Sequence, residues 1–255
     1  MNSKLKTAEE LQQTIRSLSP EKKWDASFLG KVKLDFTFHN NKLENNTITY
    51  GQTVRYLKEA VTPKDVSVKD CIDIKNHFEI LDVVFSSFGQ PITESSILNL
   101  HAQLMKSRLQ WDEETIYSPG KYKTGKNFTV QTSGKLIEYM EPEKVRDAIR
   151  KLLESIKSKS ENEHPVVAAT YFHNRILEIH PFEDGNGRIC RIFTNMIFIN
   201  SGYPPIFISD TERTKYLQIF EFDTIEKDKK MQNFFTDQLI ESLKIKLDFI
   251  NHANK

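Results

Sequence analysis

The sequence predicts a mostly α-helical protein with a single β-hairpin. Three observations indicate this fold: helix-start signals recur along the chain, apolar residues between them return at helical spacing, and one glycine-punctuated stretch alternates as strands do. The chain has 255 residues, of which 38% are hydrophobic and 28% are charged. This length suffices for a sizeable core, and the composition is typical of a soluble globular protein.

Capping signals locate the helices expected in the first half of the chain. Thr7 and Glu10 form the pattern of a capping box, Thr49 and Gln52 form a second one, and Thr93 precedes a run with helical spacing. Such residues satisfy backbone amides that the first helical turn leaves without acceptors. We therefore expect helices at about 7–18, 49–60, 68–88 and 93–107.

The hairpin is expected near the middle of the chain. Segments 127–131 and 135–139 alternate in a β-like way around Thr132, Ser133 and Gly134, which suit a short turn. The two strands should therefore pair in an antiparallel manner.

Helical pattern resumes after the hairpin. Pro142 suits the first turn of a helix, because its missing N–H would have no intrahelical acceptor there. The polar stretch at 158–163 is expected to be a loop. Further helices are predicted at about 165–179, 186–201, 210–225 and 230–251.

Charge and cysteine usage exclude several classes of protein. Lys and Arg number 36 against 35 Asp and Glu, so no basic excess points to nucleic acid as the main partner. Cys71 and Cys190 stand alone, which favours reduced thiols over a disulfide framework. The N-terminus is polar, and no apolar run approaches the roughly 18 residues that a membrane helix needs. We expect a cytoplasmic protein with no membrane partner.

One segment carries the residues for chemistry. Gly185, Asn186 and Gly187 stand where a helix is predicted to begin. Glycine lets the backbone approach a ligand closely, and the amides of a helix N-terminus attract anions. The segment is therefore a candidate cradle for phosphate groups.

The charged residues around this cradle suit the same ligand. Arg188 and Arg191 are three positions apart, and a guanidinium matches phosphate oxygens. Asp184 could hold Mg²⁺, which proteins commonly bind through one or two carboxylates together with substrate phosphates. His180 can take a proton near neutral pH. Taken singly, each of these residues is more often structural, and only their order and density favour phosphoryl or nucleotidyl chemistry.

The whole segment, HPFEDGNGRICR from His180 to Arg191, resembles the Fic family signature HPFx(D/E)GNGRxxR at every fixed position. The resemblance covers about residues 35–245. It implies a mostly α-helical Fic domain at 35–255 with one β-hairpin, preceded by a helical extension at 1–34.

The resemblance also implies an activity, the transfer of AMP from ATP to a Ser, Thr or Tyr hydroxyl of a target protein. His180 would deprotonate the hydroxyl, and Asp184 would hold Mg²⁺ on the α- and β-phosphates. Arg188 would bind phosphate, and Arg191 would bind the γ-phosphate. The anion hole would be lined by Gly185, Asn186 and Gly187.

Two further segments have counterparts in the family. The hairpin at about 126–139 resembles the family flap, where Phe128, Thr129 and Val130 would dock an extended target segment; the alternative is a surface hairpin over a core edge. Residues 40–45, within an expected inhibitory helix at about 36–45, resemble the family pattern (S/T)xxxE(G/N), although Asn40 replaces Ser or Thr. Its glutamate, Glu44, would pair with Arg191 and exclude the γ-phosphate; the alternative is a solvated side chain.

Several alternatives stay open at this stage. The group moved could be UMP, phosphocholine or phosphate, or Glu44 could support removal of AMP. A non-catalytic module that binds nucleotide or a partner is the hypothesis from another class. The target could be the chain itself, and a homodimer is open because relatives associate through their helical surface. His173 is expected to pack behind the loop, and Cys190 is expected to be a buried, inert thiol.

Overall fold

The computed structural model describes residues 3–19, 24, 26–86, 88–106, 118–131 and 133–253. Within these ranges the chain forms ten α-helices, two short 3₁₀ turns and a two-stranded sheet, so the predicted mostly α-helical fold is confirmed. In chain order the elements are α1 (Ser3–Leu18), α2 (Ala26–Lys42), α3 (Tyr50–Glu59), α4 (Val68–Ser86), α5 (Glu94–Leu104), β1 (Phe128–Val130), β2 (Leu136–Glu138), α6 (Pro142–Asn162), α7 (Pro165–Ile179), α8 (Asn186–Asn200), η1 (Asp210–Glu212), α9 (Arg213–Gln218), η2 (Ile219–Glu221) and α10 (Thr224–Ala253).

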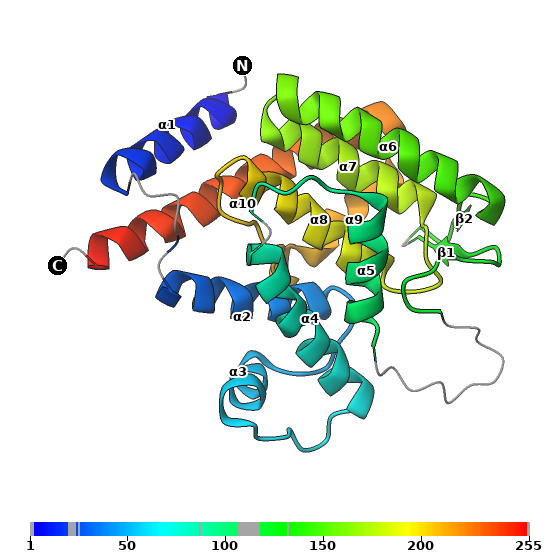
Figure 1. Ribbon diagram of the computed structural model, residues 1–255, viewed down its shortest axis with the longest axis horizontal. Coiled ribbons are helices and arrows are strands. Elements are labelled where there is room, and N and C mark those ends of the chain that lie inside the picture. The colour runs from blue at the N-terminus through cyan, green and yellow to red at the C-terminus, as the bar shows by residue number, and fades with distance from the viewer. Residues whose placement is uncertain are drawn as a thin grey trace.

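Helix α8 is the centre of the molecule. Nearly all of its residues are buried, and it contacts α7, α5, α4 and α2 (Figure 1). Helix α6 packs on α7, and the long α10 packs on both α7 and α1. A helix that is buried on all sides is held by tertiary packing more than by its own propensity. Its N-terminus, and the loop that leads into it, are therefore fixed by the surrounding helices.

Several local signals produced the expected elements. Thr49 and Thr93 each cap a helix through a capping box, with Gln52 and Ser96 as their partners. Pro142 begins α6 as predicted. The hairpin is antiparallel, and Phe128 lies opposite Glu138 in its register. Gly134, at φ +82°, supplies the positive φ of the turn, whereas Thr132 of the predicted turn lies outside the described residues.

Two predicted helix starts were wrong. Thr7 does not cap α1, because the helix already includes Ser3 and the Thr7 hydroxyl donates to the Ser3 carbonyl. Helix α10 begins at Thr224 instead of about residue 230. The Asp223 carboxylate accepts from the amides of Ile225 and Glu226, which caps a helix whose first turn is too polar to show a hydrophobic period.

Two other predictions in the second half also failed. The expected loop at 158–163 is helical as far as Asn162, since bonds such as Lys159 to Glu163 at 2.9 Å support a polar helix surface. The helix expected at 210–225 is instead divided into η1, α9 and η2.

The domain boundary expected at residue 34 falls inside α2, which is continuous through it.

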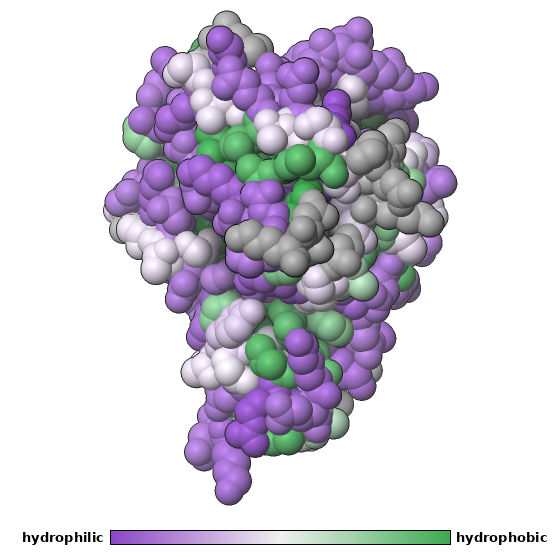
Figure 2. All heavy atoms as spheres, turned by 90° about the vertical axis from the view of Figure 1, so that its left-hand side faces the viewer, coloured by the Kyte–Doolittle hydropathy of each residue, from purple (hydrophilic) through white to green (hydrophobic). Residues whose placement is uncertain are grey.

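The face that carries α1 and the C-terminal part of α10 is mostly hydrophilic. Figure 2 shows this side, with hydrophobic residues gathered in a band across its upper half. Among the described residues, no helix has both the length and the apolar character needed to cross a bilayer.

Candidate active site

The loop between α7 and α8 is closed by two unusual backbone positions and one amide side chain. His180 ends α7 in the left-handed region at φ 50°, and Gly185 precedes α8 at φ 80°. Between them, the Asn186 side chain accepts from the Phe182 amide at 2.9 Å and donates to the Phe182 carbonyl at 2.7 Å. Asn186 thus holds the turn itself, and the amides at the start of α8 form the candidate anion site.

The conformation of His180 differs from the one expected for a residue before proline. Pro181 favours extended backbone at the preceding position. Instead the His180 amide donates to the Ile176 carbonyl at 2.9 Å as the last bond of α7. The chain must reverse at this point to reach α8, and the left-handed residue makes that reversal. Strained non-glycine backbone of this kind concentrates at functional sites.

The His180 ring is held on one face by Tyr139. The two ring centroids lie 3.7 Å apart with an interplanar angle of 13°, and His180 Nδ1 lies 3.4 Å from the Leu177 carbonyl. Burial lowers the pKa of His180 to about 4 and outweighs the opposing Leu177 hydrogen bond, while nearby Lys123 also lowers it. The imidazole is therefore neutral at physiological pH. With Nδ1–H directed at Leu177, Nε2 is the atom that can accept a proton.

Asp184 lies at the mouth of the loop. Its side chain is 48% exposed, and Oδ1 accepts from the Gly185 amide at 2.5 Å. Within the described ranges, no group of three or more His, Cys, Asp or Glu side chains could hold a metal ion. An exposed single carboxylate beside an anion site fits Mg²⁺, because substrate phosphates and waters usually supply its other ligands.

His101 on α5 holds the main chain of Asp184, and sequence reasoning missed it. Its ring stacks on Phe182 at 3.7 Å, with Nε2 directed at the Asp184 carbonyl at 2.9 Å. His101 Nδ1 accepts from the Gly120 amide at 2.9 Å, so the proton lies on Nε2, which donates. No local pattern marks His101, since its partners are remote in sequence. Phe182 is fully buried and anchors the loop.

The two arginines of the motif diverge from the shared face that their spacing suggested. Arg188 is 2% exposed, and its Nη1 lies 2.8 Å from the Asp73 carboxylate of α4. Arg188 Nη2 lies 3.8 Å from Asp184 and 3.5 Å from the Met105 sulfur. In this structure, therefore, the Arg188 guanidinium is directed into the protein, one helical turn from the candidate metal ligand.

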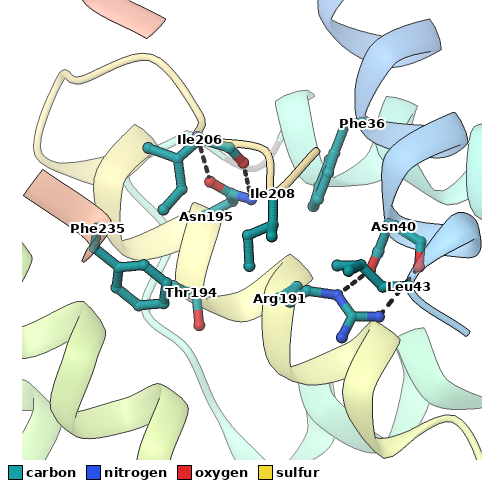
Figure 3. Close-up of a pocket in the computed structure, with 9 residues that line it drawn as sticks. All are labelled: Phe36, Asn40, Leu43, Arg191, Thr194, Asn195, Ile206, Ile208 and Phe235. Atoms are coloured by element: carbon teal, nitrogen blue, oxygen red, sulfur yellow. Dashed lines mark hydrogen bonds between the residues drawn. The ribbon is translucent and has the colours of Figure 1, made fainter. Parts of the chain in front are cut away.

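Arg191 is directed instead toward α2 and the turn after it. Its Nη2 donates to Glu44 Oε1 at 2.5 Å. Arg191 also donates to Asn40, from Nη2 to the carbonyl at 3.1 Å and from Nε to Oδ1 (Figure 3). Burial lowers the pKa of Arg191, but Glu44, Tyr216 and Cys190 together raise it by more, so the net shift of the Arg191 pKa is upward. Glu44 follows the end of α2, and Asn45 takes a left-handed conformation after it, at φ 63°.

Asn40 joins this pair to a buried histidine. Its side-chain amide lies 2.5 Å from His77 Nε2, and His77 Nδ1 lies 3.1 Å from the Thr37 hydroxyl. Burial and the two motif arginines lower the pKa of His77 well below its ordinary value, so this ring is neutral and accepts from Asn40. Asparagine at position 40 therefore serves as both acceptor for Arg191 and donor to His77, which a serine or threonine could not reproduce in the same way.

A small cavity lies beside Arg191, lined by residues that Figure 3 draws from α2 and the turn after it, α8, the segment before α9, and α10. With a volume of about 10 Å³ it has room for about one water molecule at most. It is therefore too small for a nucleotide, and the candidate substrate site is the open side of the loop.

The hairpin base is bonded to the His180 loop. Lys123 N donates to the Pro181 carbonyl at 2.9 Å, and the Asn127 side chain donates to the Phe182 carbonyl at 3.0 Å. Glu183, to which the sequence assigned no role, accepts from the amides of Thr124 and Gly125. These bonds fix where the hairpin stands relative to the loop.

The outer part of the hairpin is apolar and exposed. Phe128 is 67% exposed, Val130 is 61% exposed and Leu136 is 59% exposed, and Thr129 lies between the first two on β1. Exposed apolar side chains on a short strand are typical of a docking surface.

The other two residues considered from the sequence are structural. His173 is fully buried, and its Nε2 lies 2.9 Å from the Tyr216 hydroxyl. Cys190 is fully buried, and burial raises the pKa of its thiol. Both findings agree with the packing roles expected for them.

Comparisons with known proteins show that the loop and the fold are similar to those of one family. A model of the Fic/DOC family matches residues 91–198. The protein adenylyltransferase Fic of Drosophila persimilis is 28% identical over 186 residues, covering 70% of this chain and 34% of that protein. Its namesake from Nematostella vectensis is 26% identical over 184 residues, covering 71% and 41%.

A solved structure agrees with these sequences. A Fic domain containing signaling protein from Bacteroides thetaiotaomicron aligns with a TM-score of 0.84 at 28% identity, covering 96% of this chain and 97% of that chain. The present chain spans about a third to two fifths of the length of the two curated relatives.

Fold and loop together define a helical domain with a β-hairpin beside its central helix. The turn before that helix begins at a histidine and ends at a glycine. Residues 91–198 match the Fic/DOC family model, and the relatives and the solved structure extend this similarity to most of the chain.

Proposed function

We propose that this chain transfers AMP from ATP to a Ser, Thr or Tyr hydroxyl of a target protein. The observation that carries the proposal is a neutral His180 imidazole beside the amides that open α8. The curated relatives are named protein adenylyltransferases, which supports the same reaction.

In the proposed reaction, the target hydroxyl oxygen attacks the α-phosphorus of ATP. The bond between that phosphorus and the α–β bridging oxygen breaks, and pyrophosphate leaves. His180 Nε2 receives the hydroxyl proton, which its neutral form allows. The amides of Gly187 and its neighbours stabilise the phosphate charge, as helix N-termini do.

Asp184 would hold Mg²⁺ in this scheme, since it is the exposed carboxylate next to the anion site. The bound metal ion would neutralise charge on the phosphates. His101 and the Asn186 amide keep the Asp184 loop in place through main-chain bonds. We include Arg188 in the phosphate site only through its placement within one turn of Asp184.

We further propose that Glu44 inhibits this activity. Arg191 is the cation that the γ-phosphate of a productively bound ATP would require, and the Glu44 carboxylate lies 2.5 Å from it. A carboxylate and a phosphate cannot both accept hydrogen bonds from the same N–H groups of one guanidinium. Glu44 therefore competes with ATP for Arg191, and its removal should activate the enzyme.

The proposed target docks on the hairpin. Within the described residues β1 pairs only with β2, so an extended segment could add along its other edge. Exposed Phe128 and Val130 would contact apolar side chains of that segment. The targets to be tested include the chain itself. The proposed reaction takes place in the cytoplasm.

The test uses ATP labelled on either the α- or the γ-phosphate. With the Glu44→Ala chain and a cell lysate, we expect protein to carry the α-label and not the γ-label, and we expect His180→Ala to abolish labelling. Incorporation of the γ-label would instead establish phosphorylation. No incorporation of either label by Glu44→Ala, under conditions where it binds ATP, would reject the proposed activity.

A further inference from the structure

Tyr139, the first residue after β2, has no role in the reaction described above, although it touches the proposed base. Its ring is stacked on His180 at a centroid distance of 3.7 Å, nearly parallel. Among the described residues, the only hydrogen bond of the His180 side chain is the 3.4 Å approach of Nδ1 to the Leu177 carbonyl. That distance is close to the limit for a hydrogen bond, so it restrains the ring weakly.

The hairpin fixes where Tyr139 lies. The Tyr139 amide donates to the Asn127 carbonyl at 3.1 Å, which extends the ladder one step beyond β2. The Asn127 side chain donates to the Phe182 carbonyl, in the same loop as His180. Strand pairing and loop thus hold the two rings in register. The Tyr139 hydroxyl also shares a hydrogen bond with Thr129, in the middle of β1.

We infer that Tyr139 is a positioning residue, which fixes the plane of the His180 ring. Through Thr129, it also links that ring to β1. The inference rests on the proposed function, because it assigns the part that orients the base. A ring that can rotate about its side-chain bonds presents Nε2 to the substrate only part of the time. Catalysis depends steeply on such alignment.

The stack also affects the electrostatics of the base. Tyr139 covers one face of His180 and excludes water from it. The charged groups that act on His180 are Lys123 before β1, which opposes its protonation, and Glu44 and Asp184, which favour it. Replacing Tyr139 by a smaller side chain leaves these charges in place and admits water. The pKa of His180 should then rise from about 4 toward its ordinary value.

The first test observes the stack directly, without any activity. In the full-length chain with ¹³C-labelled histidine, we expect the His180 Cε1–H resonance, assigned with His180→Ala, to carry a ring-current shift. Tyr139→Leu should abolish that shift and raise the pKa of His180, whereas Tyr139→Phe should keep both. The matched control is Tyr171→Leu, on the helix that His180 follows, α7. Tyr171 contacts Lys159 and Arg175 away from the site. An unchanged His180 resonance in Tyr139→Leu would overturn the inference.

The second test measures self-labelling or lysate labelling in the Glu44→Ala background. We expect Tyr139→Leu to lower the rate at saturating ATP by roughly tenfold with little change in the KM for ATP, and Tyr139→Phe to stay within about threefold. The acid limb of the pH–rate profile should move to higher pH in Tyr139→Leu. If Glu44→Ala labels strongly and Tyr139→Leu labels equally well with the same profile, the positioning role is wrong. If Glu44→Ala does not label at all, the proposed function fails, while the NMR test still decides the stack.

Discussion

Replacing Glu44 by alanine should lower stability and raise activity together. The Glu44 carboxylate lies 2.5 Å from Arg191 Nη2, and the Arg191 side chain is only 7% exposed. A hydrogen bond to a charged group contributes roughly 1.5–3 kcal/mol. Because Glu44 is 39% exposed, solvent screening reduces this to about 1–2 kcal/mol. For a chain of this size, we expect the Tm to fall by about 2–8 °C.

The same free energy sets the gain in activity. Glu44 and a phosphate compete for Arg191, so removing about 1–2 kcal/mol of that competition strengthens productive ATP binding by about 5- to 30-fold. The labelling rate at subsaturating ATP should rise by this factor. ATP should also raise the Tm of Glu44→Ala by more than that of the unmodified chain, since ligand binding to the folded state stabilises it.

The matched control is Glu79→Ala on α4. Glu79 also lies 2.5 Å from a cation, Lys106, and it is 41% exposed, but its partner is 48% exposed and outside the site. A solvated pair of this kind contributes at most about 1 kcal/mol, so we expect a small Tm change and no gain in labelling. If Glu44→Ala behaves like Glu79→Ala in both the thermal melt and the labelling assay, Glu44 does not restrain Arg191.

Three other predictions follow from buried contacts near the loop. Asp73→Asn should lower the free energy of unfolding by about 3 kcal/mol in urea titrations, because it leaves the buried Arg188 charge with only the more distant Asp184 as a partner; a loss below 1 kcal/mol would mean that the pair is dispensable. Asn40→Ala should destabilise by about 2–4 kcal/mol, also by urea titration, since it removes the side-chain acceptor of Arg191 Nε and a donor to His77; an unchanged midpoint would contradict this network. Because burial holds the pKa of His180 near 4, labelling by Glu44→Ala should stay flat from pH 8 down to about 6, and a half-maximum near pH 6.5 would show an ordinary, exposed histidine.

Short-range features of the chain were predicted from the sequence better than helix boundaries. The loop from His180 to Arg191, the caps at Thr49 and Thr93, and the hairpin follow from residues close together in the chain. Boundaries failed where polarity was taken for a loop, as in the last turns of α6, since a helix on the surface can be polar on its outer face. The left-handed His180 also departs from the preference of a residue before proline, because tertiary packing outweighs that preference.

The sequence by itself determined the local chemistry. It supplies glycine where the turn needs a positive φ, at Gly185, an Asn186 side chain that hydrogen-bonds to Phe182 within the same turn, and a nearby histidine. Only the tertiary structure decided which partners these groups meet. Glu44 reaches Arg191 across 147 positions, and Tyr139 reaches His180 from a separate hairpin. Caps and turns depend on a few neighbouring dihedral angles, whereas these contacts exist only after α8 has been buried among helices from both halves of the chain.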